Sequence, residues 1–219
     1  MSELLSLSSG AEARLTNGSA SRAVVLVNGG QAGEVPGTWS ATLEWLVRRL
    51  APQFPELAFV EVRYRIKSWK RFDDCTEDAR AALDLTTGRG AIGCALVGFS
   101  MGGAVAIRAA AHPAVRSVIG LAPWIPERLD LNQLAGRRFA VVHGMLDRYL
   151  PGIPGVSPTS SRKGYERARA AGVLDLEYTL LPGGLHGVAI RVPWGLVRLP
   201  RAGRWADLLA GELERFQGT

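Results

Sequence analysis

The chain has 219 residues, a net charge of +6 and 47% hydrophobic residues. A chain of this length buries about 70% of the surface that its unfolded form exposes, so we expect a single domain over residues 1–219. The apolar content excludes a disordered chain, and the presence of only two cysteines excludes a disulfide-stabilised scaffold.

The sequence carries no signal for a membrane span or for secretion. The longest apolar run, residues 98–111, is interrupted by Ser100, Arg108 and glycines. It therefore falls short of the roughly 20 apolar residues that a membrane helix needs. The N-terminus has an early acid, Glu3, and no basic segment, which is untypical of a signal peptide. We expect a cytoplasmic protein without a membrane span.

The positive charge does not by itself indicate a nucleic-acid partner. All but three of the 26 Lys and Arg residues are arginines, and they are spread through the whole chain. Proteins that bind nucleic acids concentrate such residues on one face or in one arm. We therefore expect a small-molecule partner and no nucleic acid, and the oligomeric state stays open.

The order of apolar and amphipathic segments predicts the fold class. Residues 1–21 indicate an antiparallel edge hairpin near Asn17-Gly18. The short apolar runs that follow predict strands over residues 23–27, 57–62, 91–97, 115–121, 139–142 and 176–181. The amphipathic runs between them predict helices over residues 39–50 (with Thr38 as N-cap), 73–85, 101–111, 162–171 and 205–216. This alternation predicts an α/β protein with a mostly parallel, twisted sheet and helices on both faces.

Two predicted connections are longer than usual, residues 148–161 and residues 186–203. The first is rich in Pro, Gly and Ser, and the second is apolar and basic. Long ordered loops in compact domains are often functional. The second connection either covers a site as a lid or packs against the body of the protein.

The stretch Gly98-Phe99-Ser100-Met101-Gly102-Gly103 fits the pattern G-x-S-x-G between a predicted strand and a predicted helix. A serine at such a sharp turn adopts a strained backbone that presents its hydroxyl above the sheet edge. Small neighbours such as Gly98 and Gly102 let the strand and the helix approach closely. The pattern therefore predicts a nucleophilic Ser100 at the N-terminus of a helix, where an oxyanion is stabilised.

A serine nucleophile needs a base, and the chain has three histidines. His112 ends the helix that follows Ser100 and points away from it. His143 ends a strand, where we expect it to pack or to cap the strand end. His186 lies in a glycine-flanked loop after the last strand, at the sheet edge where Ser100 also emerges. The sequence therefore predicts His186 as the base.

A third group must hold the imidazole of the base in one tautomer. Asp147 fits because it follows a predicted strand closely, in the stretch His143-Gly144-Met145-Leu146-Asp147. Asp130 and Asp175 are the rivals, but both fall at the wrong ends of their strands. The resulting chain order Ser100, Asp147, His186 is typical of one particular α/β fold and differs from the orders of the two serine protease classes.

On these motifs the sequence resembles the α/β-hydrolases, of the small serine esterase, carboxylesterase and dienelactone-hydrolase-like kind. The resemblance covers residues 24–216 and also rests on Asn28-Gly29-Gly30 and Gly184-x-His186-Gly187. It implies the α/β-hydrolase fold. Residues 122–138 leave no room for the large cap domain that many members carry there.

The resemblance also implies an oxyanion hole formed by the backbone N–H groups of Met101 and Gly30, with Gln31 as the adjacent possibility. One departure is Asn28, where the family commonly has a histidine with a structural role. Dienelactone hydrolases proper use a cysteine nucleophile, so Ser100 favours an ordinary ester as substrate. No metal and no cofactor are implied.

The sequence thus predicts a serine hydrolase acting on carboxylic esters of small to medium acyl chain through an acyl-serine intermediate. A thioesterase or acyltransferase with the same triad is the alternative, and a non-catalytic hydrolase-fold binding protein is a further one. Gln31, Trp124 and Trp194 are candidates for contacts with the substrate. The basic residues between Arg63 and Arg71 either attract an anionic substrate or form a solvated loop, which is the favoured interpretation.

Overall fold

A computed structural model of the chain describes residues 2–148, 155–173 and 175–218. The strands of its main sheet are β1 (Ser2–Ser6), β2 (Glu12–Thr16), β3 (Arg22–Val27), β5 (Leu57–Arg63), β7 (Gly93–Phe99), β8 (Val115–Leu121), β9 (Arg138–Gly144) and β10 (Leu176–Leu181). The helices are α1 (Ala41–Leu50), α2 (Phe72–Gly88), α3 (Met101–Ala109), α4 (Pro158–Ala170) and α5 (Ala202–Gln217). Short elements complete the described part: β4 (Val35–Pro36), β6 (Ile66–Lys67), η1 (Trp69–Arg71), η2 (Asn132–Leu134), β11 (Ala189–Val192) and β12 (Gly195–Arg198).

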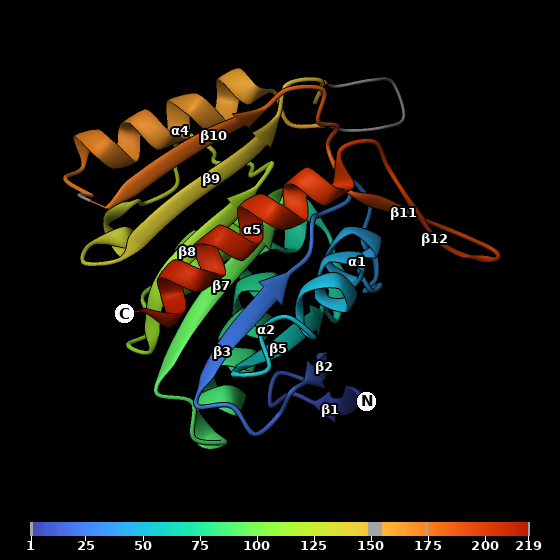
Figure 1. Cartoon of the computed structure of the whole chain (residues 1–219). Helices are drawn as coiled ribbons and strands as arrows, with labels where there is room; N and C mark the ends of the chain where they lie inside the picture. Colours follow the sequence, from blue (N-terminus) through green and yellow to red (C-terminus); the bar gives the residue numbers. More distant parts are fainter. Residues whose placement is uncertain (1, 149–154, 174, 219) are drawn as a thin grey trace.

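Within the described residues, the main sheet has eight strands in the order β1-β2-β5-β3-β7-β8-β9-β10 (Figure 1). The strands from β5 to β10 in that order pair in parallel, whereas β1 and β2 form an antiparallel edge. Parallel strands joined by helices place all their carboxyl ends at one edge of the sheet. That edge carries the loops after β3, β7, β9 and β10 that hold the predicted site residues.

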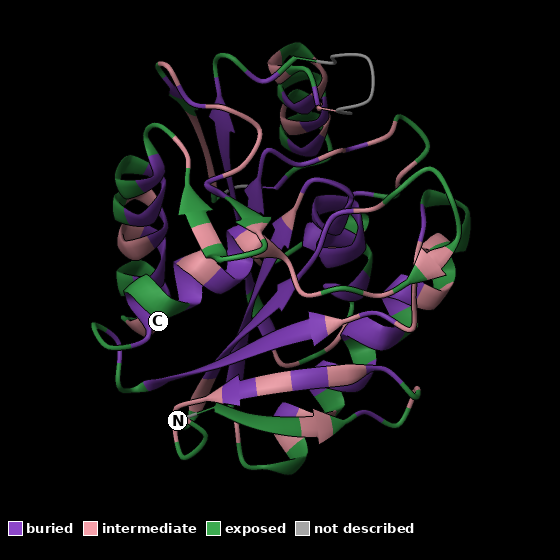
Figure 2. Ribbon diagram, turned by 90° about the vertical axis from the view of Figure 1, so that its right-hand side faces the viewer, coloured by how far each residue is buried: buried purple, intermediate pink, exposed green. Residues whose placement is uncertain are grey.

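Helices cover both faces of the sheet, and Figure 2 shows that the central strands between them are buried. Side chains of α2, α3 and α4 pack on one face, and side chains of α1 and α5 pack on the other. Strand β3 shows how the sequence suits a sheet with two covered faces. Val25 faces the first layer of helices, and Val24 and Leu26 face the second. A strand covered on both faces needs a continuous apolar run rather than an alternating one.

The predicted fold class is confirmed: the sheet is mostly parallel and the helices lie on both faces. The connection from β8 to β9 contains only the short η2, so no large cap is present among the described residues. In the same part of the chain, no helix is both long enough and apolar enough to cross a bilayer.

Several element boundaries differ from the sequence-based prediction. Helix α1 is capped by Ser40, not Thr38: the Ser40 hydroxyl accepts a hydrogen bond from the Leu43 N–H at 3.3 Å. Helix α4 begins at Pro158, capped by Ser157, and not at residue 162. Proline fits the first helical position because the missing N–H has no partner there in any helix.

The edge hairpin exists, but the predicted position of its turn is wrong. The turn between β1 and β2 spans residues 7–11, with Gly10 at φ +89°. Asn17 instead follows β2 at φ 59°, and its side-chain amide donates to the Ala51 carbonyl at 3.0 Å. Asn-Gly pairs favour any tight turn with positive φ, so the dipeptide marks a bend without saying which strands it joins.

The two long connections differ in character. Residues 149–154 of the first lie outside the described residues. The second contains β11 and β12, which form a two-stranded hairpin against α1. The hairpin is attached by an ion pair from Arg191 to Glu44 at 2.7 Å and by a hydrogen bond from the Val188 N–H to the Thr42 hydroxyl at 3.2 Å.

Candidate active site

Ser100 lies at the junction of β7 and α3 with φ 56° and ψ −121°. A residue other than glycine rarely adopts such a backbone conformation, so surrounding contacts must impose it. The Ser100 N–H donates to the Leu121 carbonyl at 3.0 Å, and the Ser100 carbonyl accepts from the Trp124 N–H at 2.9 Å. These bonds to the end of β8 and to the loop after it hold the turn in its strained form.

The glycines around Ser100 are required by close backbone approach. A Cβ atom on Gly98 would lie 2.2 Å from the carbonyl oxygen of Gly102, and one on Gly102 would lie 2.3 Å from that of Val27. Both distances are far below van der Waals contact, and backbone atoms cannot swing aside. The pattern G-x-S-x-G is therefore explained by the contact between β7, α3 and the end of β3.

The structure brings Asp147 and His186 together at the same sheet edge. Asp147 Oδ2 lies 2.6 Å from His186 Nδ1. Nδ1 must carry the proton because a carboxylate only accepts, which leaves Nε2 as the free acceptor of a neutral imidazole. The ring of His186 lies 5.0 Å from the ring of Phe99, the residue before Ser100, so the imidazole is next to the turn. Among the described residues no hydrogen bond joins His186 to the Ser100 hydroxyl; such bonds often form only when substrate binds.

A second imidazole contacts the same carboxylate. His143 Nε2 lies 3.0 Å from Asp147 Oδ2 and 2.8 Å from the carbonyl oxygen of Val156. Both neighbours are acceptors, so Nε2 carries a proton and donates to them. The other carboxylate oxygen, Oδ1, accepts from the Val156 N–H at 3.1 Å. The expectation that His143 packs or caps the strand end missed this contact, for which the spacing His143-x-x-x-Asp147 was the signal.

These donors decide the charge of Asp147, whose side chain is fully buried. Burial acts to raise the pKa of Asp147, but the hydrogen bonds from His143 and His186 outweigh it and hold the pKa below its ordinary value. Asp147 is therefore a carboxylate at neutral pH and can stabilise a positive charge on His186.

The two residues predicted for the oxyanion hole are neighbours. A Cβ atom on Gly30 would lie 2.4 Å from Met101 Sδ, so the loop after β3 packs directly on the first residue of α3. Gly29, one residue earlier, is equally close to the turn: a Cβ there would lie 3.1 Å from Ser100 Cβ. The N–H of Met101, the first residue of α3, has no partner within the helix, so it is available to an anion.

Asn28, which stands where the resembled family commonly has histidine, braces this loop. Its Oδ1 accepts from the Gly29 N–H at 2.7 Å, and its amide donates to the Thr38 carbonyl at 3.0 Å. Its own carbonyl accepts a hydrogen bond from the buried Tyr64 hydroxyl at 3.0 Å. The side chain of Asn28 thus links the beginning and the end of the loop between β3 and α1.

Trp69 is a residue of this region that the sequence did not reveal. Its indole Cδ1 and Nε1 would lie 2.2 and 2.4 Å from a Cβ on Gly30, so the pyrrole edge of the ring covers Gly30. The Trp69 N–H donates to the Gln31 carbonyl at 3.0 Å, and the side chain remains 41% exposed. A tryptophan among basic residues was its only signal, and that pattern is equally typical of a surface loop.

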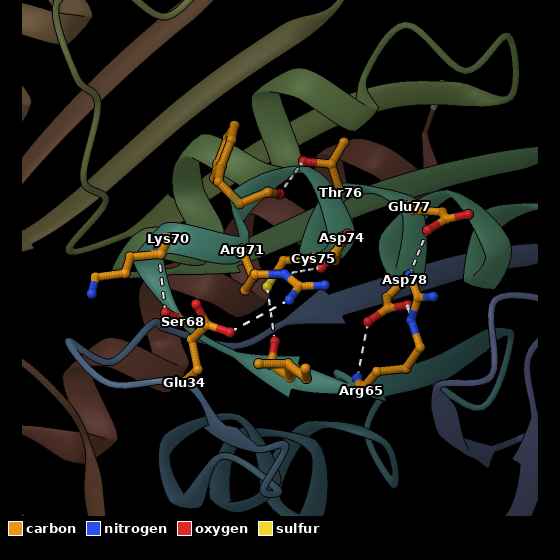
Figure 3. A network of polar contacts seen from close by, with 12 residues as sticks. Glu34, Arg65, Ser68, Lys70, Arg71, Asp74, Cys75, Thr76, Glu77 and Asp78 are labelled. Atoms are coloured by element: carbon orange, nitrogen blue, oxygen red, sulfur yellow. Dashed lines mark hydrogen bonds and ion pairs between the residues drawn. The ribbon is translucent and has the colours of Figure 1, made fainter.

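The segment that carries Trp69 is held by its own network of polar contacts (Figure 3). Arg65 pairs with Asp78 at 2.7 Å, and Arg71 pairs with Asp74 at 2.5 Å and with Glu34 at 3.4 Å. Arg63, just before it, pairs with Glu12. The arginines of this basic segment are thus engaged with carboxylates, which leaves less of their positive charge free to attract an anionic substrate.

The remaining candidates for substrate contacts have different surroundings. Trp124 is half-buried and packs edge-on against Phe72, with ring centroids 6.4 Å apart. Trp194 is 82% exposed at the tip of the β11–β12 hairpin. Gln31 is exposed, and its carbonyl holds Trp69.

The rivals for the base and the acid are engaged elsewhere. His112 pairs with Asp84 at 3.3 Å. Asp130 accepts from the Asn132 N–H at 2.9 Å, within its own loop. Asp175 forms an ion pair with Arg138.

Comparisons with known proteins agree with this fold. No protein-family model matches the sequence, and no curated protein matches it. Solved structures do match. An esterase from Pyrococcus furiosus is 13% identical, with a TM-score of 0.68 over 98% of this chain and 91% of that one. An alpha-beta serine hydrolase homologue from Coxiella burnetii is 16% identical, with a TM-score of 0.67 over 97% of each chain. A dienelactone hydrolase from Anabaena variabilis is 18% identical, with a TM-score of 0.65 over 96% of this chain and 95% of that one. The resemblance seen in the motifs thus extends over the whole described sheet, and the chain has the α/β-hydrolase fold.

Proposed function

We propose that the protein is a serine hydrolase that cleaves carboxylic esters, with Ser100 as nucleophile, His186 as base and Asp147 as the acid that orients the base. The observation that carries this proposal is the 2.6 Å contact from Asp147 to His186 Nδ1, beside the strained turn that presents Ser100. It fixes the imidazole in the tautomer whose Nε2 can accept the serine proton.

In the first half of the reaction, His186 Nε2 takes the proton of the Ser100 hydroxyl while Oγ attacks the ester carbonyl. The carbonyl π electrons move to oxygen and form a tetrahedral oxyanion. His186 then returns the proton to the departing alkoxide, the C–O bond breaks, and an acyl-serine remains. Asp147 stabilises the transient imidazolium through its contact with Nδ1.

In the second half, water replaces the alcohol. His186 removes a proton from a water molecule that attacks the acyl-serine, and it then protonates Ser100 Oγ as the acid leaves. The backbone N–H groups of Gly30 and Met101 donate to the oxyanion in both halves, with Gln31 as the neighbouring donor of the same loop. An N–H at the start of a helix suits this role because the helix dipole favours negative charge there.

Two features favour hydrolysis of small to medium esters over acyl transfer. The described chain has no cap between β8 and β9, and the His186 side chain is 22% exposed, so water can reach the proposed base. Trp69 flanks Gly30 and is 41% exposed, so its ring is available as an apolar wall beside the oxyanion hole. A thioester would be attacked by the same groups. An open site, however, lets water compete with any other acyl acceptor.

The test combines labelling and turnover. The wild type should react with a fluorophosphonate probe and hydrolyse p-nitrophenyl esters, and Ser100→Ala should lose labelling and lower kcat by on the order of 10⁶-fold. Ser21 is an exposed serine just before β3, so Ser21→Ala is the matched control and should behave as wild type. Labelling of the wild type that is no stronger than labelling of Ser100→Ala would leave only the alternative of a non-catalytic hydrolase-fold binding protein.

A further inference from the structure

The β11–β12 hairpin, residues 189–198, has two faces of different character. Ile190 pairs directly with Val197, and Arg191 pairs with Leu196. Successive side chains of a strand alternate between faces, so Ile190 and Val197 share one face and Ala189 and Arg191 share the other. The second face is the one that packs on α1, because Ala189 is 5% exposed and Arg191 reaches Glu44.

The first face is partly exposed to solvent. Ile190 is 47% exposed and Val197 is 38% exposed, and the turn between the strands presents Trp194 at 82%. Figure 1 shows the hairpin extending from the body of the molecule beyond α1. An apolar strand pair with a tryptophan at its tip is costly to leave in water, so this surface points to a binding role.

The charge around the hairpin indicates the partner. Residues 187–206 contain no Asp or Glu, and they contain four arginines: Arg191, Arg198, Arg201 and Arg204. Among the described residues, Arg198 and Arg201 form no ion pair, and both are exposed. Arg204 reaches Asp207 only at 3.9 Å. The surface therefore combines an apolar tip with uncompensated positive charge.

We propose that this hairpin docks the protein on a lipid surface that carries anionic headgroups. Trp194 enters the interfacial layer, where tryptophan is favoured because its ring is apolar and its N–H is polar. Arg198, which shares the face of its cross-strand partner Ala189, and Arg201, which follows the hairpin, are both exposed, and their guanidinium groups meet the headgroup phosphates. A second copy of this chain is a poorer partner, because it would place the same unpaired arginines against each other.

The hairpin that is proposed to dock on the membrane lies close to the candidate active site. His186 is followed by Gly187 and Val188, which lead directly into β11. A membrane held by the hairpin would therefore lie near the sheet edge with the candidate triad, and esters dissolved in that membrane would be within reach. The docking itself does not depend on the proposed hydrolase activity.

Vesicle sedimentation tests the proposal on the full chain. The probes are vesicles of phosphatidylcholine alone and of phosphatidylcholine with phosphatidylglycerol. The wild type should bind the anionic vesicles, and added salt should weaken binding. Trp194→Ser should reduce binding about tenfold, and Arg198→Gln and Arg201→Gln should each reduce it about fivefold. Ile92→Ser is the matched control: Ile92 is 71% exposed just before β7, at the opposite sheet edge, and its loss should change nothing.

Three outcomes would overturn the proposal: no preference of the wild type for anionic vesicles, equal binding by Trp194→Ser, or a wild-type dimer that Trp194→Ser converts to a monomer. Ser100→Ala should bind vesicles as the wild type does. A failure of the docking proposal is thereby distinguished from a failure of the proposed hydrolase, because binding is measured without turnover.

Discussion

His143 and His186 approach the same oxygen of Asp147, at 3.0 and 2.6 Å. The outer imidazole, His186, is partly exposed, whereas His143 is completely buried. His143 Nδ1 has no hydrogen-bond partner among the described residues, so the polar contacts of this ring are those of Nε2 with Asp147 and Val156. A buried polar atom without a partner is costly, which indicates that the contact with Asp147 offsets that cost.

We therefore expect His143→Leu to reduce the ester hydrolysis proposed above. A hydrogen bond to a charged group contributes about 1.5–3 kcal/mol, so kcat should fall about 10- to 100-fold. His143→Gln keeps a side-chain N–H near the position of Nε2 and should retain more activity than the leucine variant. The measurement is kcat and KM for a p-nitrophenyl ester, with circular dichroism to verify folding. Equal kcat in the wild type and the leucine variant would show that His143 serves packing alone.

The sequence did not predict the contact of His143 with Asp147, whereas it did place the other three residues at this sheet edge. The location of Ser100, Asp147 and His186 at one sheet edge was predictable because each follows a strand, and the ends of parallel strands meet at one edge whatever the side-chain details. Strands β8 and β10 were predicted to the residue, since each apolar run is bounded by turn residues. The sheet and its layers thus follow from local patterns.

Some details that escaped prediction depend on contacts between distant parts of the chain, and others on a choice between neighbouring residues. Trp69 covers Gly30 because the loop after β5 folds back on the loop after β3, and neither segment encodes that approach alone. The N-cap of α1 was placed on Thr38 because both Thr38 and Ser40 have suitable side chains. Which hydroxyl caps the helix depends on where the loop from β3 ends.

The depressed pKa of Asp147 makes the stability of the protein depend on pH in a definite direction. A carboxyl group whose pKa is lower in the folded state binds fewer protons there than in the unfolded state. Its contribution to the free energy of unfolding is fully present above the ordinary Asp value of 3.8, and it is lost as pH falls through the lower folded-state pKa. The contribution should therefore be constant from pH 7 to pH 5.

Urea unfolding of the wild type and of Asp147→Asn measures this contribution. At pH 7 the variant should be less stable by about 1–3 kcal/mol, because two imidazole donors lose a charged acceptor. Below pH 4 the difference should shrink, since the protonated aspartic acid resembles the amide. Other carboxyl groups titrate in both proteins and cancel in the difference. A gap that stays constant down to pH 3 would contradict the lowered pKa.

Gly30→Ala tests the loop that is proposed to donate to the oxyanion. The new methyl group would meet Trp69 Cδ1 at 2.2 Å and Met101 Sδ at 2.4 Å, so either these side chains or the loop itself must move, and we expect the Gly30 N–H to be displaced. Displacing one oxyanion donor lowers kcat by on the order of 10²–10³-fold. Gly33→Ala in the same loop is the control, because a Cβ there has its nearest neighbour at 4.0 Å.

Trp69→Ala combined with Gly30→Ala should restore part of the activity, because the ring that the methyl group meets is then absent. Trp69→Ala alone should shift the preference in a p-nitrophenyl ester series toward longer acyl chains, since it removes the proposed apolar wall. An unchanged chain-length profile together with no rescue in the double variant would remove Trp69 from the substrate site.

Two glycine-to-alanine substitutions with opposite expected effects on stability test whether the backbone turn at Ser100 is rigid. Gly98→Ala places a Cβ 2.2 Å from the Gly102 carbonyl oxygen, between two backbones that are fixed by the sheet and by α3. It should cost more than about 3 kcal/mol of stability. Gly211→Ala lies within α5, where a Cβ meets nothing within 4 Å, and should stabilise the protein by about 0.5–1 kcal/mol. Thermal unfolding measures both. A tolerated Gly98→Ala that keeps its activity would mean that the backbone around Ser100 can yield, and the strain at φ 56° would then not be imposed by this contact.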